Sequence, residues 1–514
     1  MKTKLFSVLI TLFFLPIFIY AEDCSNTCQP VEFGVDLGES HVFMHYAQSG
    51  KQFMPIIRDL NTRVSRVIVF WSKIEPKPPV NGKHTYNWKL VDALLKQIKE
   101  GDVILLTVTT TSKWATETNP EGTATGSPIK SDSRCAADIK KAGLADMGMS
   151  CYEAYADFIR DLVKHTQGKI KYWNRDTEPA LERHWPKDRP KEYVETQKIF
   201  YNAVKSVQPG AVVIGGGHAG GFNSSTGEPG NKEFFDYFLK ESGDYFDMFD
   251  VRLYADKYYN PNTSIEHRVR WFREKMKSLG YQKPIAATEY GGPTTMDFPE
   301  WGQLKKLCNE RGYKELLEYY DCKKELEEEG LVPDKLKMFF HEASLELDKK
   351  RDRIECRDIT QRTVLAAAAG VKYLGWWNIF ESQSLRNKPV HPIFGKLRLM
   401  NMEDGAKRPA YYCYQRMADK LFGMCQAERI NTENKDIYFY KISRKNKEGI
   451  YVLWHKRDLF SGEEEPPVGF KYNLGLKEAL ITDVFGKVTA LSAKDGILNL
   501  KIMDTPLFIE KVSE

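Results

Sequence analysis

Two glutamates each follow a short apolar segment that we interpret as a buried strand. Glu178 lies in WNRDTEPA and Glu289 in PIAATEYGG. Two carboxyl groups held at strand ends of one α/β barrel could serve as an acid and a nucleophile. Retaining glycoside hydrolysis requires such a pair, because one group protonates the leaving oxygen while the other attacks the sugar carbon. Either glutamate alone could instead start a helix or occupy a surface turn, so the hypothesis depends on the pair.

Eight apolar segments alternate with amphipathic ones along the chain, and these must position the glutamates. The predicted strands are Val31–Val35, Val64–Trp71, Val103–Thr109, Ile170–Trp173, Ala211–Gly216, Met248–Tyr254, Pro284–Thr288 and Tyr373–Trp377. The predicted helices are Trp88–Lys99, Tyr152–Lys164, Glu192–Val207, Phe234–Lys240, Ile265–Leu279, Gln361–Ala369 and Ala410–Phe422. Gly101, Gly168, Gly210 and Gly280 precede strands and are predicted helix stops. This alternation predicts an α/β fold, a (β/α)8 TIM barrel.

One connection, Gly291 to Asp358, is unusually long and rich in Glu and Lys at helical spacing. We interpret this charged helical insertion, at about 291–358, as a solvated surface layer. The alternative is a lid, because the segment leaves the strand end that carries Glu289 and could form a wall of the cleft.

Short alternating strands replace the helical pattern from about Asn431 to Glu514. They predict a C-terminal all-β sandwich of Greek-key type. We therefore expect a barrel domain over 22–430 and a β-sandwich domain over 431–514. The sandwich should pack against the barrel; a separate carbohydrate-binding module is the alternative.

The chain begins MKTKLFSVLITLFFLPIFIYAEDC, in which two lysines precede a long uncharged stretch that ends at Ala21. This pattern is typical of a signal peptide, here residues 1–21, and predicts a secreted, periplasmic or cell-surface protein. The apolar stretch is short for a spanning helix and no later segment is suitable, so no membrane span is predicted. The residues before Cys24 do not resemble a lipoprotein box.

Nine cysteines in such a chain predict disulfides, with at least one thiol left over. Plausible local pairs are Cys135 with Cys151, Cys308 with Cys322, and Cys413 with Cys425, although spacing alone does not fix connectivity. No CxxC or Cys/His cluster has metal-ligand spacing, so no metal site is predicted. The formal net charge is +5, and acidic and basic residues are mixed throughout the chain. This distribution argues against a nucleic-acid partner.

Glu178 follows the fourth predicted strand and Glu289 the seventh. In this respect the chain resembles the clan A glycoside hydrolases, which place the acid/base after the fourth strand and the nucleophile after the seventh. The resemblance covers nearly the whole mature chain. A barrel followed by a sandwich is most similar to glycoside hydrolase family 39 and its relatives, which include β-xylosidases and α-L-iduronidases.

The resemblance implies supporting roles for further residues. Arg66 lies on the second strand, where an arginine would keep Glu289 ionised, and Tyr254 matches a tyrosine that hydrogen-bonds the nucleophile. Trp377 would form the apolar floor under the sugar, and Trp71 is expected to point toward the same mouth. Trp114 lies in the loop Thr110–Ser150, which we expect, with the insertion, to set specificity. Without a functional role, an arginine in an apolar strand is usually a surface or edge residue, and a tyrosine or tryptophan is usually part of the core.

The sequence departs from the clan pattern directly before Glu178. Clan members carry Asn there, contacting the sugar 2-hydroxyl, whereas this chain has Thr177. A hydroxyl can still bond a sugar oxygen, with shorter reach. Asn174, three residues earlier, is a possible substitute.

The resulting expectation is a secreted retaining O-glycosyl hydrolase acting on a carbohydrate by double displacement, without metal or organic cofactor. Glu289 would attack while Glu178, kept protonated by its negative neighbour, acts as acid and then as base, with the carboxyls about 5 to 5.5 Å apart. The alternative is a catalytically impaired carbohydrate-binding protein on the same barrel. A purely structural protein would explain none of the strand-end residues. The sugar, the linkage and the oligomeric state are left open.

Overall fold

The structure is a computed structural model of the 514-residue chain. It describes residues 28–512 except 39, 118–125, 182–183, 314–318, 340–342, 382–396 and 403. The predicted signal peptide and Cys24 lie outside the described residues.

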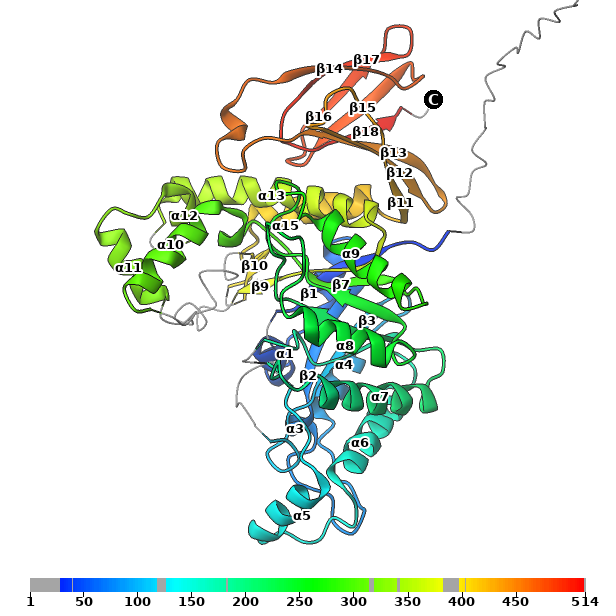
Figure 1. Ribbon diagram of the computed structural model, residues 1–514. Coiled ribbons are helices and arrows are strands. Elements are labelled where there is room, and N and C mark those ends of the chain that lie inside the picture. Colours follow the sequence, from blue (N-terminus) through cyan, green and yellow to red (C-terminus); the bar gives the residue numbers. More distant parts are fainter. Residues whose placement is uncertain are drawn as a thin grey trace, which may run out of the picture.

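A closed barrel of eight parallel strands in sequential order forms the centre of the protein (Figure 1). Its strands are β1 Glu32–Asp36, β2 Val64–Phe70, β3 Val103–Thr109, β4 Tyr172–Arg175, β5 Val212–His218, β6 Met248–Val251, β7 Ile285–Tyr290 and β8 Val371–Trp376. Each coincides with a predicted apolar segment to within a few residues, so the predicted barrel is confirmed. Three of the four predicted helix stops, Gly101, Gly168 and Gly280, adopt the positive φ angles typical of helix ends. The fourth, Gly210, is not among the residues with positive φ.

Helices surround this barrel and extend from it. They are α1 Ser40–Gln48, α2 Met54–Asp59, α3 Trp71–Ile74, α4 Lys89–Leu95, α5 Asp132–Lys141, α6 Cys151–His165, α7 Pro190–Val207, α8 Lys232–Ser242, α9 Ile265–Ser278, α10 Pro299–Glu310, α11 Tyr319–Glu328, α12 Asp334–Lys337, α13 Leu345–Ala368 and α15 Pro409–Lys420. The helices α1, α2, α3 and α5 had no counterpart among the sequence predictions. Two further short strands, β9 Phe380–Glu381 and β10 Met400–Asn401, pair with each other after the barrel.

The barrel interior is layered, and the layers position the candidate site. The apolar layer consists of Val64, Leu105, Tyr172, Ile214, Met248, Ala286 and Tyr373, from seven strands. Side chains two residues further along a strand face the same side. Five strands place polar residues there, and these are Arg66, Thr107, Asn174, Asp250 and Thr288, all buried. The polar layer lies toward the carboxyl ends of the strands, where Glu178 and Glu289 follow.

The insertion after β7 has two structurally different parts. A short 3-10 turn, η2 Thr295–Asp297, leads into α10, α11 and α12, whose apolar residues, including Phe298, Trp301 and Leu304, form a separate small core. In α13, by contrast, every residue from Ile354 to Ala367 is buried, including Glu355, Arg357 and Asp358. The interpretation of the whole segment as a solvated layer is therefore wrong for the end of the insertion, because α13 packs between α15, α9 and β8. The lid alternative stays a prediction.

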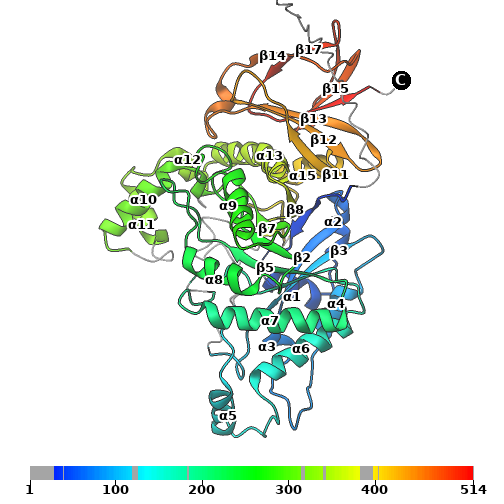
Figure 2. The ribbon, with the colours of Figure 1, turned by 45° about the vertical axis from the view of Figure 1, so that its right-hand side comes forward.

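The C-terminal residues form two antiparallel sheets, as the sequence predicted. One contains β11 Met424–Arg429, β12 Ile437–Arg444, β13 Lys447–His455, β15 Glu478–Asp483, β16 Val488–Ser492 and β18 Leu507–Lys511, and the other contains β14 Val468–Asn473 and β17 Ile497–Ile502. The first strand, β11, begins before the predicted boundary at 431. Both views place this sandwich at one end of the molecule, against α13 and α15 (Figures 1 and 2).

Polar contacts join the sandwich to α13. Arg353 Nη2 and Arg357 Nη1 each lie 2.7 Å from the Glu463 carboxylate, which belongs to the connection between β13 and β14. Gln361 Nε2 donates to the Asp504 carbonyl at 2.7 Å. These contacts bind the sandwich to α13, which itself packs against barrel strand β8.

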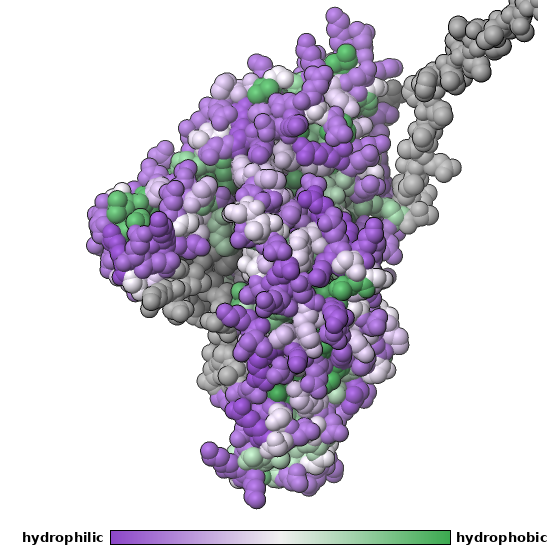
Figure 3. Space-filling view, viewed as in Figure 1, coloured by the Kyte–Doolittle hydropathy of each residue, from purple (hydrophilic) through white to green (hydrophobic). Residues whose placement is uncertain are grey.

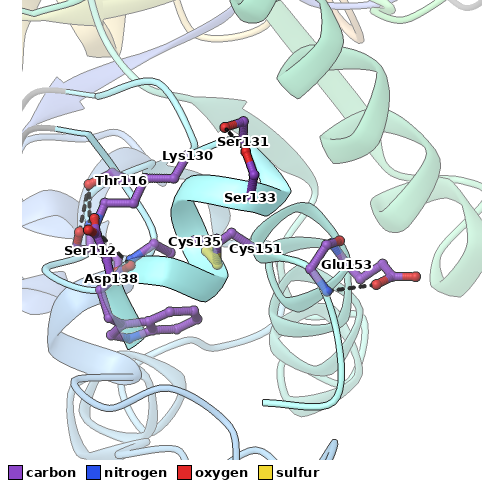
Figure 4. The surroundings of a disulfide bond; sticks show 12 residues. Ser112, Thr116, Lys130, Ser131, Ser133, Cys135, Asp138, Cys151 and Glu153 are labelled. Atoms are coloured by element: carbon purple, nitrogen blue, oxygen red, sulfur yellow. Dashed lines mark hydrogen bonds and ion pairs between the residues drawn. A yellow bond between two sulfur atoms is a disulfide. The ribbon is translucent and has the colours of Figure 1, made fainter. Parts of the chain in front are cut away.

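Four disulfides join described cysteines: Cys28–Cys425, Cys135–Cys151, Cys308–Cys322 and Cys356–Cys413. Two predicted pairs are confirmed, and Figure 4 shows one of them, Cys135–Cys151, joining α5 to α6. The predicted pair Cys413–Cys425 is wrong. Cys413 meets Cys356 because α15 packs on α13. Cys425 meets Cys28 because the segment just before β1 lies beside β11, where Val31 N donates to Met424 O.

On the face shown in Figure 3, hydrophilic residues predominate and hydrophobic patches are small. Within the described ranges no helix has both the length and the apolar character that crossing a bilayer requires. The same residues contain no group of three or more His, Cys, Asp or Glu side chains placed to hold a metal ion.

Candidate active site

Glu178 is carried by a tightly held loop after β4. Asp176, Glu178 and Ala180 all have positive φ angles, of 54°, 47° and 69°, which cost non-glycine residues energy. The Asp176 carboxylate compensates by accepting hydrogen bonds from Thr110 N at 2.6 Å and from Thr110 Oγ1 at 3.0 Å. The preceding Arg175 stacks on the rings of Tyr193 and Trp185 and is ion-paired with Asp176. Glu178 therefore projects from a fixed backbone, with its side chain 12% exposed.

Glu289, near the end of β7, is surrounded by donors. Its Oε1 is ion-paired with Arg66 and lies 3.2 Å from Arg252 Nη2, and it accepts a hydrogen bond from Thr177 Oγ1 at 3.2 Å. Its Oε2 accepts from the Tyr254 hydroxyl at 3.1 Å. The structure thus brings Arg66, Thr177 and Tyr254 to this carboxylate.

These contacts determine the charge state of Glu289. Burial alone would raise its pKa, but the charges of Arg252 and Arg66, together with hydrogen bonds from Arg66 and Tyr254, lower the pKa from 4.5 to about 2. The carboxylate is therefore ionised throughout the neutral range. An ionised, partly shielded carboxylate is the form that can attack an electrophilic carbon.

Arg252 is one of the site residues that sequence reasoning missed. It follows β6, and its buried guanidinium contacts Asp250, Thr288 and Thr177 in addition to Glu289. Its Nε lies 3.7 Å from Glu178 Oε1. The signal was present in the sequence, since MFDVRLY places a cation directly after an apolar strand, as SRVIVFW places Arg66 within one.

A third carboxyl, Asp36 at the end of β1, was also missed. Its Oδ2 accepts from Arg66 Nη1 at 2.9 Å, and its Oδ1 accepts from Gly38 N at 2.8 Å. Burial, together with the negative charge of Glu289, raises the pKa of Asp36 to about 7 against the opposing charge of Arg66. Arg66 therefore lies between two acidic groups, of which Glu289 is the more readily ionised.

His184 is a further missed neighbour. Its Nε2 lies 3.3 Å from Glu178 Oε2. It occurs in the segment after β4, ERHWP, where nothing in the sequence distinguished it from a loop histidine. The described ion-pair contacts of Glu178 are thus with a cation and a histidine.

Thr177 and Asn174 differ from the roles expected for them. The Thr177 hydroxyl donates to Glu289 and accepts from Arg252, so it is engaged with the protein. Asn174 Nδ2 donates to the Ile214 carbonyl at 3.0 Å, and its Oδ1 accepts from Thr107 Oγ1 at 3.3 Å. Asn174 therefore joins β3, β4 and β5 inside the barrel and does not replace the clan asparagine.

The prediction that Trp71 points toward the mouth is wrong. Because β2 ends at Phe70, Trp71 begins the helical turn α3 and no longer follows the strand alternation. It is fully buried, stacks on Phe158 and donates to Glu75 Oε2 at 2.8 Å. Trp114 packs edge-on against it and is only 6% exposed. The two tryptophans stabilise the loops beside the barrel.

Trp377, directly after β8, is partly exposed. Its backbone N donates to the Tyr290 carbonyl at 2.9 Å, which places it next to the residue that follows Glu289. Among the three predicted tryptophans, it is the one that is not buried.

The chain is similar to known proteins in structure and not in sequence. Neither a protein-family model nor a curated protein sequence matches the chain. Solved structures do match, and one is a family 39 glycoside hydrolase from Bacteroides cellulosilyticus WH2, with 15% identity, a TM-score of 0.57, and coverage of 94% of this chain and 81% of that one.

Two further structures align over nearly the full length of both chains. A monomeric β-xylosidase from Caulobacter crescentus CB15 shows 14% identity and a TM-score of 0.52, with coverage of 95% and 98%. The catalytic domain of the family 30 xylanase C from Talaromyces cellulolyticus shows 10% identity and a TM-score of 0.53, with coverage of 94% and 98%. The chain therefore has the overall fold of these glycoside hydrolase structures, a (β/α)8 barrel followed by a β-sandwich.

Proposed function

We propose that this protein is a secreted retaining glycoside hydrolase that cleaves O-glycosidic bonds of an oligosaccharide, polysaccharide or glycoconjugate. The observation that carries the proposal is Glu289, a buried carboxylate held ionised by Arg66, Arg252 and Tyr254 beside a second, partly exposed carboxyl at Glu178. Four disulfides among the described residues support an oxidising compartment.

In the first step a Glu289 oxygen attacks the anomeric carbon, and the bond from that carbon to the leaving oxygen breaks. Glu178 gives its proton to the leaving oxygen. In the second step the Glu178 carboxylate takes a proton from water, the water oxygen attacks the anomeric carbon, and the ester bond to Glu289 breaks. The anomeric configuration is retained. Arg66 and Tyr254 hold Glu289 in the ionised form, and Trp377 offers a face for the sugar ring.

A panel of aryl glycosides tests the activity, beginning with xylosides and glucosides because the similar structures include a β-xylosidase and a glucosidase. NMR of the first product should show retained configuration. Glu289→Gln should abolish turnover, whereas Glu178→Ala should retain activity on dinitrophenyl glycosides, whose leaving group needs no proton. Full activity of Glu289→Gln would refute the assignment.

The alternative, a carbohydrate-binding protein without turnover, is motivated by Thr177 in place of asparagine. An activated 2-fluoro glycoside separates the two functions, because only a working nucleophile becomes covalently modified. Intact-protein mass spectrometry should show one added glycosyl group, and peptide mapping should place it on Glu289. Sugar binding without labelling would favour the alternative.

A further inference from the structure

Arg252 contacts both candidate catalytic carboxyls through different nitrogens of one guanidinium. Its Nη2 lies 3.2 Å from Glu289 Oε1, and its Nε lies 3.7 Å from Glu178 Oε1. The third nitrogen, Nη1, contacts Asp250 and Thr288. Because the guanidinium is planar and its side chain is only 2% exposed, these contacts fix its orientation between the two carboxyls.

We infer that Arg252 is a positioning residue that promotes the second step by favouring the ionised form of Glu178 once Glu289 has been esterified. This inference rests on the proposed function. In the free enzyme the positive charge of Arg252 is partly balanced by the Glu289 carboxylate. When Glu289 becomes a glycosyl ester it loses its negative charge, and the nearest remaining catalytic carboxyl to Arg252 is Glu178.

The two steps require opposite protonation states of Glu178. It must carry a proton to release the leaving group and must be ionised to deprotonate water. A nearby cation favours the ionised carboxylate. While Glu289 is charged it offsets part of the charge of Arg252, so Arg252 opposes the protonated Glu178 of the first step only weakly. Once Glu289 is esterified that part of the balance is lost, and Arg252 assists the second step by favouring ionised Glu178.

Arg66 is placed differently, although it also binds Glu289. Its Nη1 is shared between Glu289 and Asp36, and its Nε donates to Thr107 Oγ1 at 2.9 Å. These contacts join Arg66 to β1, β3 and β7. Arg252 Nη2 instead donates to Thr177, the residue directly before Glu178. The Thr177 hydroxyl thus accepts a hydrogen bond from Arg252, the same cation that contacts the neighbouring Glu178.

The test compares Arg252→Lys and Arg252→Met with the wild type in stopped-flow assays. The probe is the 2,4-dinitrophenyl glycoside of the sugar that the wild type cleaves fastest. With this leaving group the first step needs no proton, so slowing of the second step appears as a stoichiometric burst of dinitrophenolate. Arg252→Met should show this burst, followed by turnover at least about tenfold slower than the wild type. Arg252→Lys, which keeps the charge, should be less affected.

Azide provides a second readout, because it attacks the glycosyl ester without needing a general base. It should accelerate steady-state turnover of Arg252→Met and yield a glycosyl azide. A variant in which both steps slow equally, without burst and without azide rescue, would overturn the role of Arg252 and leave it a structural arginine.

Two controls address stability. Arg268→Lys changes another buried arginine, which donates to the backbone carbonyls of Arg252, Tyr254 and Asp256, and it should show no burst. If Arg252→Met alone is unstable because Asp250 loses its ion-pair partner, the double variant Asp250→Asn/Arg252→Met removes that unpaired charge. If Arg252→Met is labelled normally at Glu289 by the 2-fluoro glycoside, and the ratio of the rates of its two steps equals that of the wild type, only this inference is refuted. If the wild type itself is not labelled at all, the proposed function is refuted as well.

Discussion

Buried charges of both signs meet at the carboxyl ends of the barrel strands. Asp36, Asp250 and Glu289 are paired with Arg66 and Arg252, and all five residues are at most 6% exposed. Burying so many charges is costly unless each is paired. Their concentration around one carboxylate is therefore better explained by control of its ionisation than by stability of the barrel.

The sequence drew attention to Glu178 and Glu289 because each follows or ends an apolar strand, and the family resemblance added Arg66, within the second strand, and Tyr254, after the sixth. Arg252 and Asp36 satisfy the same description and were missed, because a strand-end charge has meaning only when its partner across the barrel is known. The roles of Trp71 and Asn174 failed for a different reason. Both are polar or aromatic residues near strand ends, but the direction of the first and the hydrogen bonds of the second depend on local backbone geometry.

At this scale we predict the effect of Tyr254→Phe. The substitution removes a hydrogen bond to the charged Glu289, a contact of about 1.5 to 3 kcal/mol, so kcat/KM should fall about 10- to 100-fold. Because that hydrogen bond lowers the pKa of Glu289, the acidic limb of the pH profile should move to higher pH. Tyr281→Phe, which loses a hydroxyl donating to the Leu239 carbonyl at 2.7 Å, is the matched control. An unmoved acidic limb in Tyr254→Phe would contradict the assigned contact.

Among the elements, α13 shows most clearly where sequence patterns mislead. Its charged residues indicated a solvated helix, yet Lys257, Asp358, Arg362 and Asp297 form a fully buried network that joins it to the loops after β6 and β7. Charge density marks exposed helices only when the charges lack buried partners. The strands, in contrast, were predictable because barrel strands buried on both faces are apolar over most of their length.

Glu355 in α13 leads to a prediction about pH and stability. It is fully buried, both carboxylate oxygens have no hydrogen-bond partner among the described residues, and burial raises its pKa from 4.5 to about 8. A raised pKa in the folded state means that its contribution to stability is complete below pH 4.5 and is lost as the pH rises toward 8. Each unit of pKa shift corresponds to about 1.4 kcal/mol, so the loss should amount to a few kcal/mol.

Glu355→Gln should therefore reduce the fall in the free energy of unfolding between pH 5 and pH 8, measured by urea denaturation. Glu346→Gln, which alters an exposed glutamate in the same helix, should leave that pH dependence as in the wild type. Equal slopes in the wild type and Glu355→Gln would show that Glu355 does not titrate in this range.

At the scale of the whole molecule, the disulfides divide into local and long-range bonds. Cys135–Cys151 and Cys308–Cys322 span 16 and 14 positions, whereas Cys356–Cys413 and Cys28–Cys425 span 57 and 397. Spacing in the sequence suggested both local pairs, but it also suggested the wrong pair Cys413–Cys425. The long-range pairs depend on which helices pack together and on where the barrel meets the sandwich, and neither can be derived from spacing.

We predict that the long-range bond Cys28–Cys425 stabilises the fold more than the local bond Cys135–Cys151. In the chain-entropy description a loop of about 15 residues gives about 3 kcal/mol, and a loop of 100 residues about 4.7 kcal/mol, with longer loops giving more. The double variant Cys28→Ser/Cys425→Ser should therefore lose more free energy of unfolding than Cys135→Ser/Cys151→Ser. Urea denaturation of both variants measures the difference, and equal losses would contradict the prediction.

The position of α13 has a consequence for engineering by module exchange. This one helix ends the insertion, packs on barrel strand β8 and binds the sandwich through Arg353, Arg357 and Gln361. A cut at the boundary between barrel and sandwich would strip partners from a helix that also supports the strand leading to Trp377. Chimaeras with related proteins should therefore exchange the sandwich together with α13, because the unit that can be transplanted is defined by this shared helix and not by the linear domain boundary.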